Sequence, residues 1–181
     1  MIGSDFMVQA VFIDRDGTIG GNDDVTLPDH FVLYPFSNEA FDLLKQNKVK
    51  LFAFTNQPDI SRGLCSDQQF ITELTGFGFD DVYLCPQQPD EKCKCRKPSK
   101  YLLEKAVKEH NLSLSDCAVI GDRWSDMLAG ITAGTKTILV RTGAGQDALN
   151  KDQDKWNRDD ADYIAENLLD AVNWILNKKM T

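Results

Sequence analysis

The chain has 181 residues, of which 42% are hydrophobic and 27% are charged, and its formal net charge is −8 at pH 7. This length predicts one domain, residues 1–181, with its own hydrophobic core. A negative chain without a basic run argues against nucleic acid or a membrane surface as a partner, because neutralising phosphates needs clustered Lys and Arg. No stretch approaches the roughly 20 apolar residues of a membrane-spanning helix.

The N-terminal sequence MIGSDFMVQAVF lacks the charged start and the long apolar run of a secretory signal, so we expect a cytoplasmic protein. Residues 1–6 are interpreted as a stretch added by cloning ahead of a native Met7. In the cytoplasm we expect reduced thiols rather than disulfides. The cysteines are Cys65, Cys85, Cys93, Cys95 and Cys117.

Apolar runs alternate with helical patterns along the whole chain. The expected strands are 8–13, 51–54, 82–84, 118–120 and 137–140. The expected helices are 37–45, 66–74, 99–111, 127–133 and 167–179, and 151–160 is expected to be a loop. This alternation predicts an α/β fold with a mainly parallel sheet and helices on both faces. Ligands of such folds bind beyond the carboxyl ends of the strands.

Serines precede three of these helices and are expected to cap them. Ser37 and Ser99 stand where an N-cap hydroxyl would accept a backbone hydrogen bond. Ser66, with Gln69 three residues later, has the spacing of a capping box. The sequence therefore predicts sharp helix starts at these positions.

Acidic and polar residues follow the expected strands directly. Asp14 and Asp16 follow the first strand, Asp122 follows the fourth, and Thr55 with Asn56 ends the second. The ends of parallel strands lie at one edge of the sheet, so these groups should converge. Gathered carboxylates raise one another's pKa, and Mg²⁺ removes that repulsion because it prefers carboxylate, carbonyl, water and phosphate oxygens.

These residues suit phosphoryl transfer. A carboxylate can attack phosphorus, and a second acid two residues later can protonate the leaving group and then activate water. Hydroxyl, amide and lysine groups can hold the phosphoryl oxygens. Asp-x-Asp-Gly also occurs in calcium loops and surface turns, and Gly-Asp is common in turns. The order of the motifs, each after an expected strand, favours the enzyme.

The motifs DRDGT, TNQ, RKP and GDRWSD resemble those of the haloacid dehalogenase-like (HAD) superfamily of phosphohydrolases, and the similarity covers nearly the whole chain. It implies a Rossmann-like HAD fold, with Asp14 as nucleophile and Asp16 as general acid/base. Mg²⁺ would be bound by Asp14, the Asp16 backbone carbonyl and Asp122. By the same resemblance, the groups that contact the phosphoryl group are Thr55, Asn56 and Lys97.

Three further charged residues stand beside these motifs. Asp126 lies one helical turn after Asp122, where it would support the metal through water or orient Lys97; the alternative is a solvated helix acid. For Arg15 and Arg123, a solvated or structural role stands beside substrate contact. Asp16 also bears on the type of reaction. A phosphate ester needs an acid to protonate its leaving group, whereas haloacid dehalogenases expel halide and lack that acid, so Asp16 favours a phosphatase over a dehalogenase.

The segment CPQQPDEKCKCRKP, within a loop insert at 85–98, has three cysteines at ligand-like spacing. It resembles the zinc loop of the HAD subgroup that contains heptose-bisphosphate and histidinol-phosphate phosphatases. In that subgroup Cys85, Cys93 and Cys95 would bind Zn²⁺, but Gln87 replaces the usual histidine. Two interpretations stay open. In the first, the three cysteines hold zinc together with water, Gln87 or Cys65 as the fourth ligand. In the second, the loop has lost zinc and folds by hydrogen bonds. Cys117 is expected in the core.

The segments between the motifs leave no room for a substantial cap domain, since 18–55 and 56–97 are short. Specificity must then come from loops such as 20–31 and the cysteine segment. In the former, Asp23 and Asp24 are expected to be solvated turn residues. Arg96, beside Lys97, is expected to contact substrate, as in the subgroup. The stretch NQPDISRG differs from the subgroup pattern at Pro58 and Asp59.

The sequence therefore predicts a Mg²⁺-dependent phosphatase that hydrolyses a small phosphorylated metabolite through an aspartyl-phosphate, with sugar phosphates or bisphosphates favoured. Histidinol phosphate is the second substrate candidate. A phosphotransferase using the same intermediate and a non-catalytic binding module are the alternative functions. The partner is expected to be a small-molecule phosphate ester, and we take a monomer as the expected state.

Overall fold

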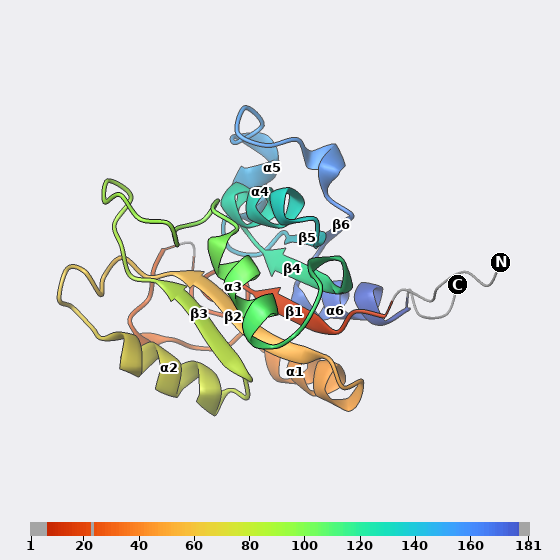
Figure 1. Cartoon of the computed structure of the whole chain (residues 1–181), viewed down its shortest axis with the longest axis horizontal. Coiled ribbons are helices and arrows are strands. Elements are labelled where there is room, and N and C mark those ends of the chain that lie inside the picture. Colours follow the sequence, from red (N-terminus) through yellow and green to blue (C-terminus); the bar gives the residue numbers. More distant parts are fainter. Residues whose placement is uncertain (1–6, 23, 178–181) are drawn as a thin grey trace.

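A computed structural model describes residues 7–22 and 24–177 (Figure 1). The interpretation of 1–6 as an added stretch, and that of Asp23 as a turn residue, lie outside these residues. The described chain forms a six-stranded parallel sheet in the order β3-β2-β1-β4-β5-β6. The strands are β1 (Ala10–Ile13), β2 (Lys50–Asn56), β3 (Asp81–Cys85), β4 (Cys117–Gly121), β5 (Lys136–Val140) and β6 (Tyr163–Ala165).

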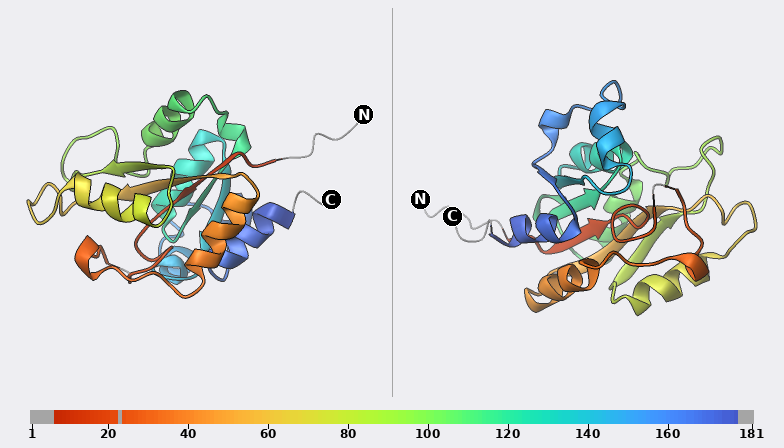
Figure 2. Two further views of the ribbon diagram at one scale, coloured as in Figure 1. Left: turned by 90° about the horizontal axis from the view of Figure 1, so that it is seen from below. Right: turned by 180° about the vertical axis from the view of Figure 1, so that it is seen from behind.

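Helices cover both faces of the sheet, which is why the central strand β1 is buried along its whole length. Helices α1 (Ser37–Gln46), α2 (Asp67–Gly76) and α6 (Leu168–Asn177) pack on one face, and α1 and α6 lie side by side (Figure 2). Helices α3 (Tyr101–Glu109), α4 (Trp124–Ala133) and α5 (Gly145–Asn150) pack on the other. The predicted α/β class with a parallel sheet is confirmed.

The register places the ends of the central strands at one level. Ile13 at the end of β1 pairs with Ala53 of β2 and with Ile120 of β4. The residues that follow these strands therefore meet at one edge of the sheet. Between Thr18 and Thr55 the described chain adds only a short 3-10 helix (Pro28–His30) and α1 before β2, which fits the expected absence of a large cap.

All five predicted strands and all five predicted helices are present, with ends that differ by a few residues. Helix α4 begins at Trp124 rather than at 127. Strand β6 and helix α5 were not predicted, and the loop expected at 151–160 contains a 3-10 helix, Arg158–Asp160. Within the described part of the chain, no helix is long and apolar enough to cross a membrane.

The three serines at the helix starts behave differently. The capping box of Ser66 and Gln69 is confirmed. The prediction for Ser37 is wrong, because Ser37 is the first helical residue and its buried hydroxyl donates to the Ile19 carbonyl at 2.7 Å. Ser99 lies one residue before the N-cap Lys100, yet its hydroxyl accepts a hydrogen bond from the Tyr101 N–H at 3.2 Å.

Candidate active site

Three buried carboxylates meet at the carboxyl edge of the sheet. Asp14 follows β1, Asp122 follows β4, and Asp126 lies in the first turn of α4. Each offers an oxygen atom, and these oxygens all lie within 4.8 Å of one another. The structure thus brings together the two strand-end acids Asp14 and Asp122, as expected. It buries Asp126 with them, so the interpretation of Asp126 as a solvated helix acid is wrong.

Backbone contacts fix the loops that carry these acids. The Asp14 N–H donates to the Ile120 carbonyl at 3.0 Å, and the Ala144 N–H donates to Asp122 Oδ2 at 2.7 Å. Gly17 has φ +80° and packs so closely on Asp122 that a Cβ at residue 17 would overlap its carboxylate. The glycine of the DRDGT motif is therefore required by the approach of two loops.

Lys97 is the cation inside this cluster. Its buried Nζ lies 2.8 Å from Asp14 Oδ1 and 2.6 Å from Asp126 Oδ1, and it donates to the Phe54 carbonyl at 2.8 Å. Its backbone N–H donates to Asn56 Oδ1 at 3.1 Å. Burial disfavours the ammonium, but the two carboxylates outweigh that cost and raise the pKa of Lys97.

One ammonium among three carboxylates leaves an excess of negative charge. Burial, together with the charges of Asp14 and Asp126, raises the pKa of Asp122 well above its ordinary value. Burial likewise raises the pKa of Asp126 to about 6, although Lys97 opposes the shift. A cluster of hard oxygen donors whose ionised forms are disfavoured by burial and by one another fits a divalent cation such as Mg²⁺.

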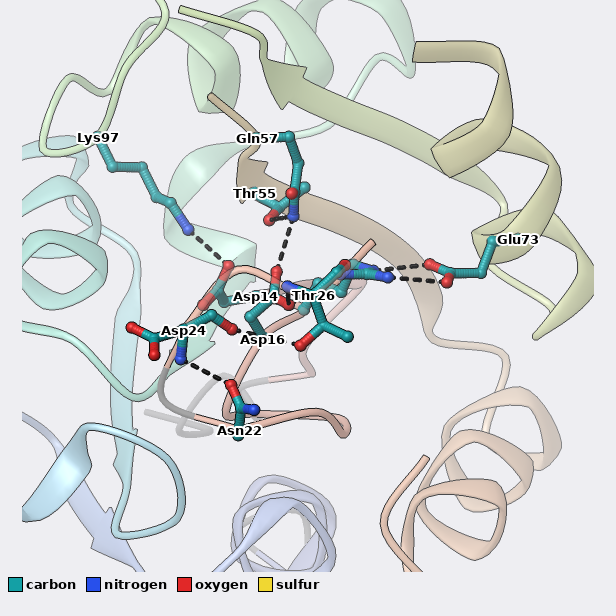
Figure 3. A network of polar contacts seen from close by, with 10 residues as sticks. Asp14, Asp16, Asn22, Asp24, Thr26, Thr55, Gln57, Glu73 and Lys97 are labelled. Atoms are coloured by element: carbon teal, nitrogen blue, oxygen red, sulfur yellow. Dashed lines mark hydrogen bonds and ion pairs between the residues drawn. The ribbon is translucent and has the colours of Figure 1, made fainter. Parts of the chain in front are cut away.

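Asp16 lies beside this cluster but faces a different set of donors (Figure 3). Its Oδ1 accepts from Arg15 Nη1 and from the Thr26 N–H, and its Oδ2 accepts from Gln57 Nε2, each at 2.8 Å. Gln57 Nε2 also donates to Thr55 Oγ1 at 2.9 Å. Burial raises the pKa of Asp16, with Arg15 as the main opposing charge.

For Arg15 the sequence left a solvated or structural role and substrate contact open, and Gln57 had no assigned role. Arg15 is fully buried, which excludes a solvated role, and it does not line the pocket described below. Gln57 is also fully buried. The only signal for Gln57 was its place in the TNQ motif. Both side chains contact Asp16 directly.

A cavity of about 570 Å³ opens beside these residues. It brings together the predicted site residues Asp14, Asp16, Thr55, Asn56, Arg96, Lys97 and Arg123. Asp24, which is exposed and lies in a turn, stands at its rim with Glu91 and Trp124. The pocket is therefore acidic at its base, where Asp14 and Asp16 lie, and carries guanidinium groups in its wall.

The two pocket arginines differ in setting. Arg96 is half-buried, and its Nη1 donates to the Gln87 carbonyl at 2.9 Å. Burial lowers the pKa of Arg96; the Cys93 sulfur opposes this, and the positive charge of Arg123 adds to it. Arg123 is exposed, and the acids around it raise its pKa against the effect of burial. The pocket wall thus holds two cations close enough to influence each other.

The cysteine loop gathers its three sulfurs at one point. The sulfurs of Cys85 and Cys95 are in direct contact, and the Cys93 sulfur lies 3.4 Å from that of Cys85. The expectation of reduced thiols stays a prediction. A disulfide does not bind zinc as a thiolate does, so the loop fits Zn²⁺ only when it is reduced.

The suggested fourth zinc ligands are not in this cluster. With the oxygen and nitrogen of its side-chain amide exchanged, Gln87 donates through that nitrogen to the two Glu91 carboxylate oxygens, at 2.9 and 3.2 Å. Cys65 packs against the core on the α1–α2–α6 side of the sheet. Cys117 is buried in the opposite core, as predicted, and burial raises the pKa of its thiol to about 12.

Comparison with known proteins bears on the function. A family model described as HAD-hydrolase-like matches residues 94–171. The D-glycero-beta-D-manno-heptose-1,7-bisphosphate 7-phosphatase of Helicobacter pylori strain J99 is 36% identical over 180 residues, covering 92% of this chain and 97% of the relative. The enzyme of that name from Haemophilus ducreyi is 34% identical over 185 residues, covering 92% of this chain and 98% of the relative.

A solved structure extends the similarity to three dimensions. The crystal structure of the D,D-heptose 1,7-bisphosphate phosphatase from B. bronchiseptica, in complex with magnesium and phosphate, superposes with a TM-score of 0.81. The two proteins are 25% identical, and the match covers 94% of this chain and 99% of the other. That relative holds a magnesium ion and a phosphate on the same fold.

Proposed function

Because the chain belongs to the HAD superfamily of phosphatases, we propose that it removes the 7-phosphate of a heptose 1,7-bisphosphate in a Mg²⁺-dependent reaction. The observation that carries this proposal is the cluster of Asp14, Asp122, Asp126 and Lys97, of which Asp14 and Lys97 line the pocket. The names of the curated relatives support the choice of substrate.

In the first half of the reaction, a carboxylate oxygen of Asp14 attacks phosphorus. The bond between phosphorus and the ester oxygen breaks, and Asp16 gives its proton to that oxygen as the sugar leaves. Asp14 then carries the phosphoryl group as an acyl phosphate. The ammonium of Lys97, already 2.8 Å from Asp14 Oδ1, offsets the negative charge on the transferring oxygens.

In the second half, Asp16 takes a proton from water as the water oxygen attacks the same phosphorus. The bond to Asp14 breaks, inorganic phosphate leaves, and both acids return to their starting states. Thr55 and Asn56, which line the pocket next to Asp14, contact the phosphoryl oxygens in both steps. Asp126 holds Lys97 in place through their 2.6 Å ion pair.

Asp14, the backbone carbonyl of Asp16 and Asp122 would hold the Mg²⁺ ion, with Asp126 supporting the site from behind. When bound, the ion neutralises charge on the carboxylates and on the phosphoryl group. The raised pKa values of Asp122 and Asp126 support this assignment, because burial disfavours their negative charges, with Asp14 adding to the effect, and a bound cation would offset both causes.

A second phosphate on the substrate matches the pocket wall. Arg96 and Arg123 face the same cavity as the reacting group, and a guanidinium binds phosphate through paired hydrogen bonds. We assign Arg96 to the distal phosphate, with Arg123 adding positive charge. Histidinol phosphate has no second phosphate, so these two cations favour the bisphosphate over that alternative.

The test uses the purified protein with heptose 1,7-bisphosphate, first stripped of metal by a chelator and then titrated with Mg²⁺. We expect Mg²⁺-dependent loss of the 7-phosphate signal in the phosphorus NMR spectrum, with the 1-phosphate retained. Histidinol phosphate serves as the comparison substrate, and an added alcohol reports phosphotransfer as a new ester. No phosphate release at saturating Mg²⁺ would overturn the proposal.

For the cysteine loop, we propose that the reduced protein binds Zn²⁺ through Cys85, Cys93 and Cys95. Three sulfur donors within 4.8 Å of one another support this. The ion would brace the loop that precedes Arg96 and Lys97. A cytoplasmic location and a monomeric state stay predictions from the sequence.

A further inference from the structure

We propose that Arg15 is a positioning residue that fixes the Asp16 carboxylate for proton transfer to the leaving group, through a guanidinium anchored on Glu73 of α2. This inference rests on the proposed function and adds two residues to it. Arg15 lies between the two acids of the DRDGT motif in sequence, but its side chain is fully buried and is not among the residues that line the pocket.

The contacts at Asp16 leave its carboxylate one orientation. Arg15 Nη1 bridges Asp16 Oδ1 at 2.8 Å and the Thr26 carbonyl at 2.7 Å. The Thr26 N–H returns a hydrogen bond to the same Oδ1 at 2.8 Å, so Thr26 is held from both sides. Gln57 fixes the other oxygen. Rotation of the carboxylate would break several of these hydrogen bonds at once.

The guanidinium itself is anchored at its far side. Arg15 Nε and Nη2 bind the two oxygens of Glu73 at 2.6 and 2.8 Å in a bidentate pair. The Phe31 and Phe70 rings lie 3.8 and 4.9 Å from the guanidinium carbon and hold its plane. The orientation of Asp16 thus depends on a helix residue 58 positions away in the chain.

Stability alone does not explain this arrangement. A buried ion pair gains little net stability over apolar residues of similar volume, since desolvation offsets most of the attraction. The pair does provide direction, because the planar fork of an arginine binds at fixed angles. A proton donor needs such direction, since transfer requires alignment with the leaving oxygen.

The consequence can be measured through the leaving group. Phenolate is a poor leaving group and gains much from protonation, whereas 4-nitrophenolate leaves readily without a proton. The two phosphate esters differ by one nitro group and make no sugar contacts. The ratio kcat/KM reports the steps up to the first bond cleavage, so a fault in the proton donor lowers this ratio for phenyl phosphate selectively.

The experiment measures kcat/KM for both esters at saturating Mg²⁺ in the wild type, Glu73→Gln and Arg15→Lys. Glu73→Gln keeps Arg15 and the side-chain volume but loses one bond of the bidentate pair. Arg15→Lys keeps the charge but cannot reach both carboxylates. General acids contribute roughly 10²- to 10⁴-fold, so we expect phenyl phosphate to lose about 10- to 100-fold in Arg15→Lys and less in Glu73→Gln. For 4-nitrophenyl phosphate we expect a loss below about threefold.

Ser37→Ala is the matched control, because it removes a buried hydrogen bond to Ile19 from a helix outside the pocket. It should affect both esters equally. Equal losses for both esters in the Arg15 and Glu73 variants, or no loss in either, would overturn the positioning role while leaving the phosphatase intact. A wild type that cleaves neither ester and no heptose bisphosphate would overturn the proposed function itself.

Discussion

The carboxylate cluster and the cysteine loop both have the composition of a metal site, yet they are built differently. Asp14, Asp122 and Asp126 come from separate elements and are brought together by the parallel sheet and the start of α4. Cys85 ends β3, and Cys93 and Cys95 lie in the loop that follows, so that all three fall within 11 consecutive positions. The first site therefore exists only in the folded protein, whereas the second depends on local chain geometry.

The two sites also differ in the chemistry by which their closely spaced side chains can be stabilised. Carboxylates cannot bond to one another, so the acid cluster must retain a proton, pair with Lys97 or bind a cation. Thiols can instead bind a soft metal ion together or be oxidised in pairs. We therefore predict that the first site needs a hard divalent cation to work, whereas the second holds either zinc or a disulfide.

The largest expected effect is that of Asp14→Asn. An amide at this position can still accept a hydrogen bond from Lys97, but it cannot form the acyl phosphate. We expect kcat for 4-nitrophenyl phosphate to fall at least about 10³-fold, as when other nucleophiles are removed. Phosphate release at saturating Mg²⁺ measures the loss. A circular dichroism melt that matches the wild type would show that the fold is kept, and full activity of the variant would show that the nucleophile is misassigned.

A smaller effect, on stability, is expected for Asp122→Asn. The pKa of Asp122 is raised in the folded protein, so the native state binds a proton more tightly than the unfolded chain. The resulting stability is present at low pH and is lost as the pH rises from about 3.8 through the native pKa. Lys97 does not cancel this loss, since its raised pKa contributes equally at every pH well below 10.5.

The metal-free Asp122→Asn variant should therefore melt higher than the metal-free wild type at pH 7.5, by roughly 2–6 °C. The difference should shrink towards pH 4.5, where the wild-type acid keeps its proton. Mg²⁺ should raise the melting temperature of the wild type but not that of the variant. Thermal melts at the two pH values, with and without Mg²⁺, measure this. A variant that is destabilised at pH 7.5 would contradict the excess of negative charge.

The secondary structure could be predicted where neighbouring residues alone determine it. The buried strands at 10–13, 117–121 and 136–140 were found because continuous apolar runs ended in turn residues. Strand β6 (Tyr163–Ala165) was missed because it has only three residues, two of them half-buried, and follows a charged loop. Ser37 was misread because its hydroxyl prefers the Ile19 carbonyl, which lies 18 positions away.

The same limit applies to the site. Asp14 and Asp122 could be predicted to meet because both directly follow strands whose ends lie at one edge of a parallel sheet. Lys97 lies well after β3 and was assigned from the resemblance of the RKP motif. The role of Arg15 could not be predicted, since its partner Glu73 lies on α2 and belongs to no motif. The state of the cysteine loop could not be predicted either, because the spacing of its cysteines suits a metal and a disulfide equally.

The smallest expected effect separates the two sites most directly. Cys93→Ser removes one sulfur from the loop but leaves Cys85 and Cys95 free to pair. Because Cys93 is half-buried and has no assigned part in the reaction, although it lines the same pocket, we expect kcat to stay within about twofold of the wild type at saturating Mg²⁺. Metal analysis should find about one zinc per chain in the reduced wild type and much less in the variant, since three thiolates are already fewer than a closed zinc site requires.

The KM of the Cys93→Ser variant should rise more than its kcat falls, because the loop carries Arg96 through its hydrogen bond to the Gln87 carbonyl. A loss of kcat comparable to that of Asp14→Asn would mean that the sulfur cluster belongs to the catalytic machinery and that the two sites act as one.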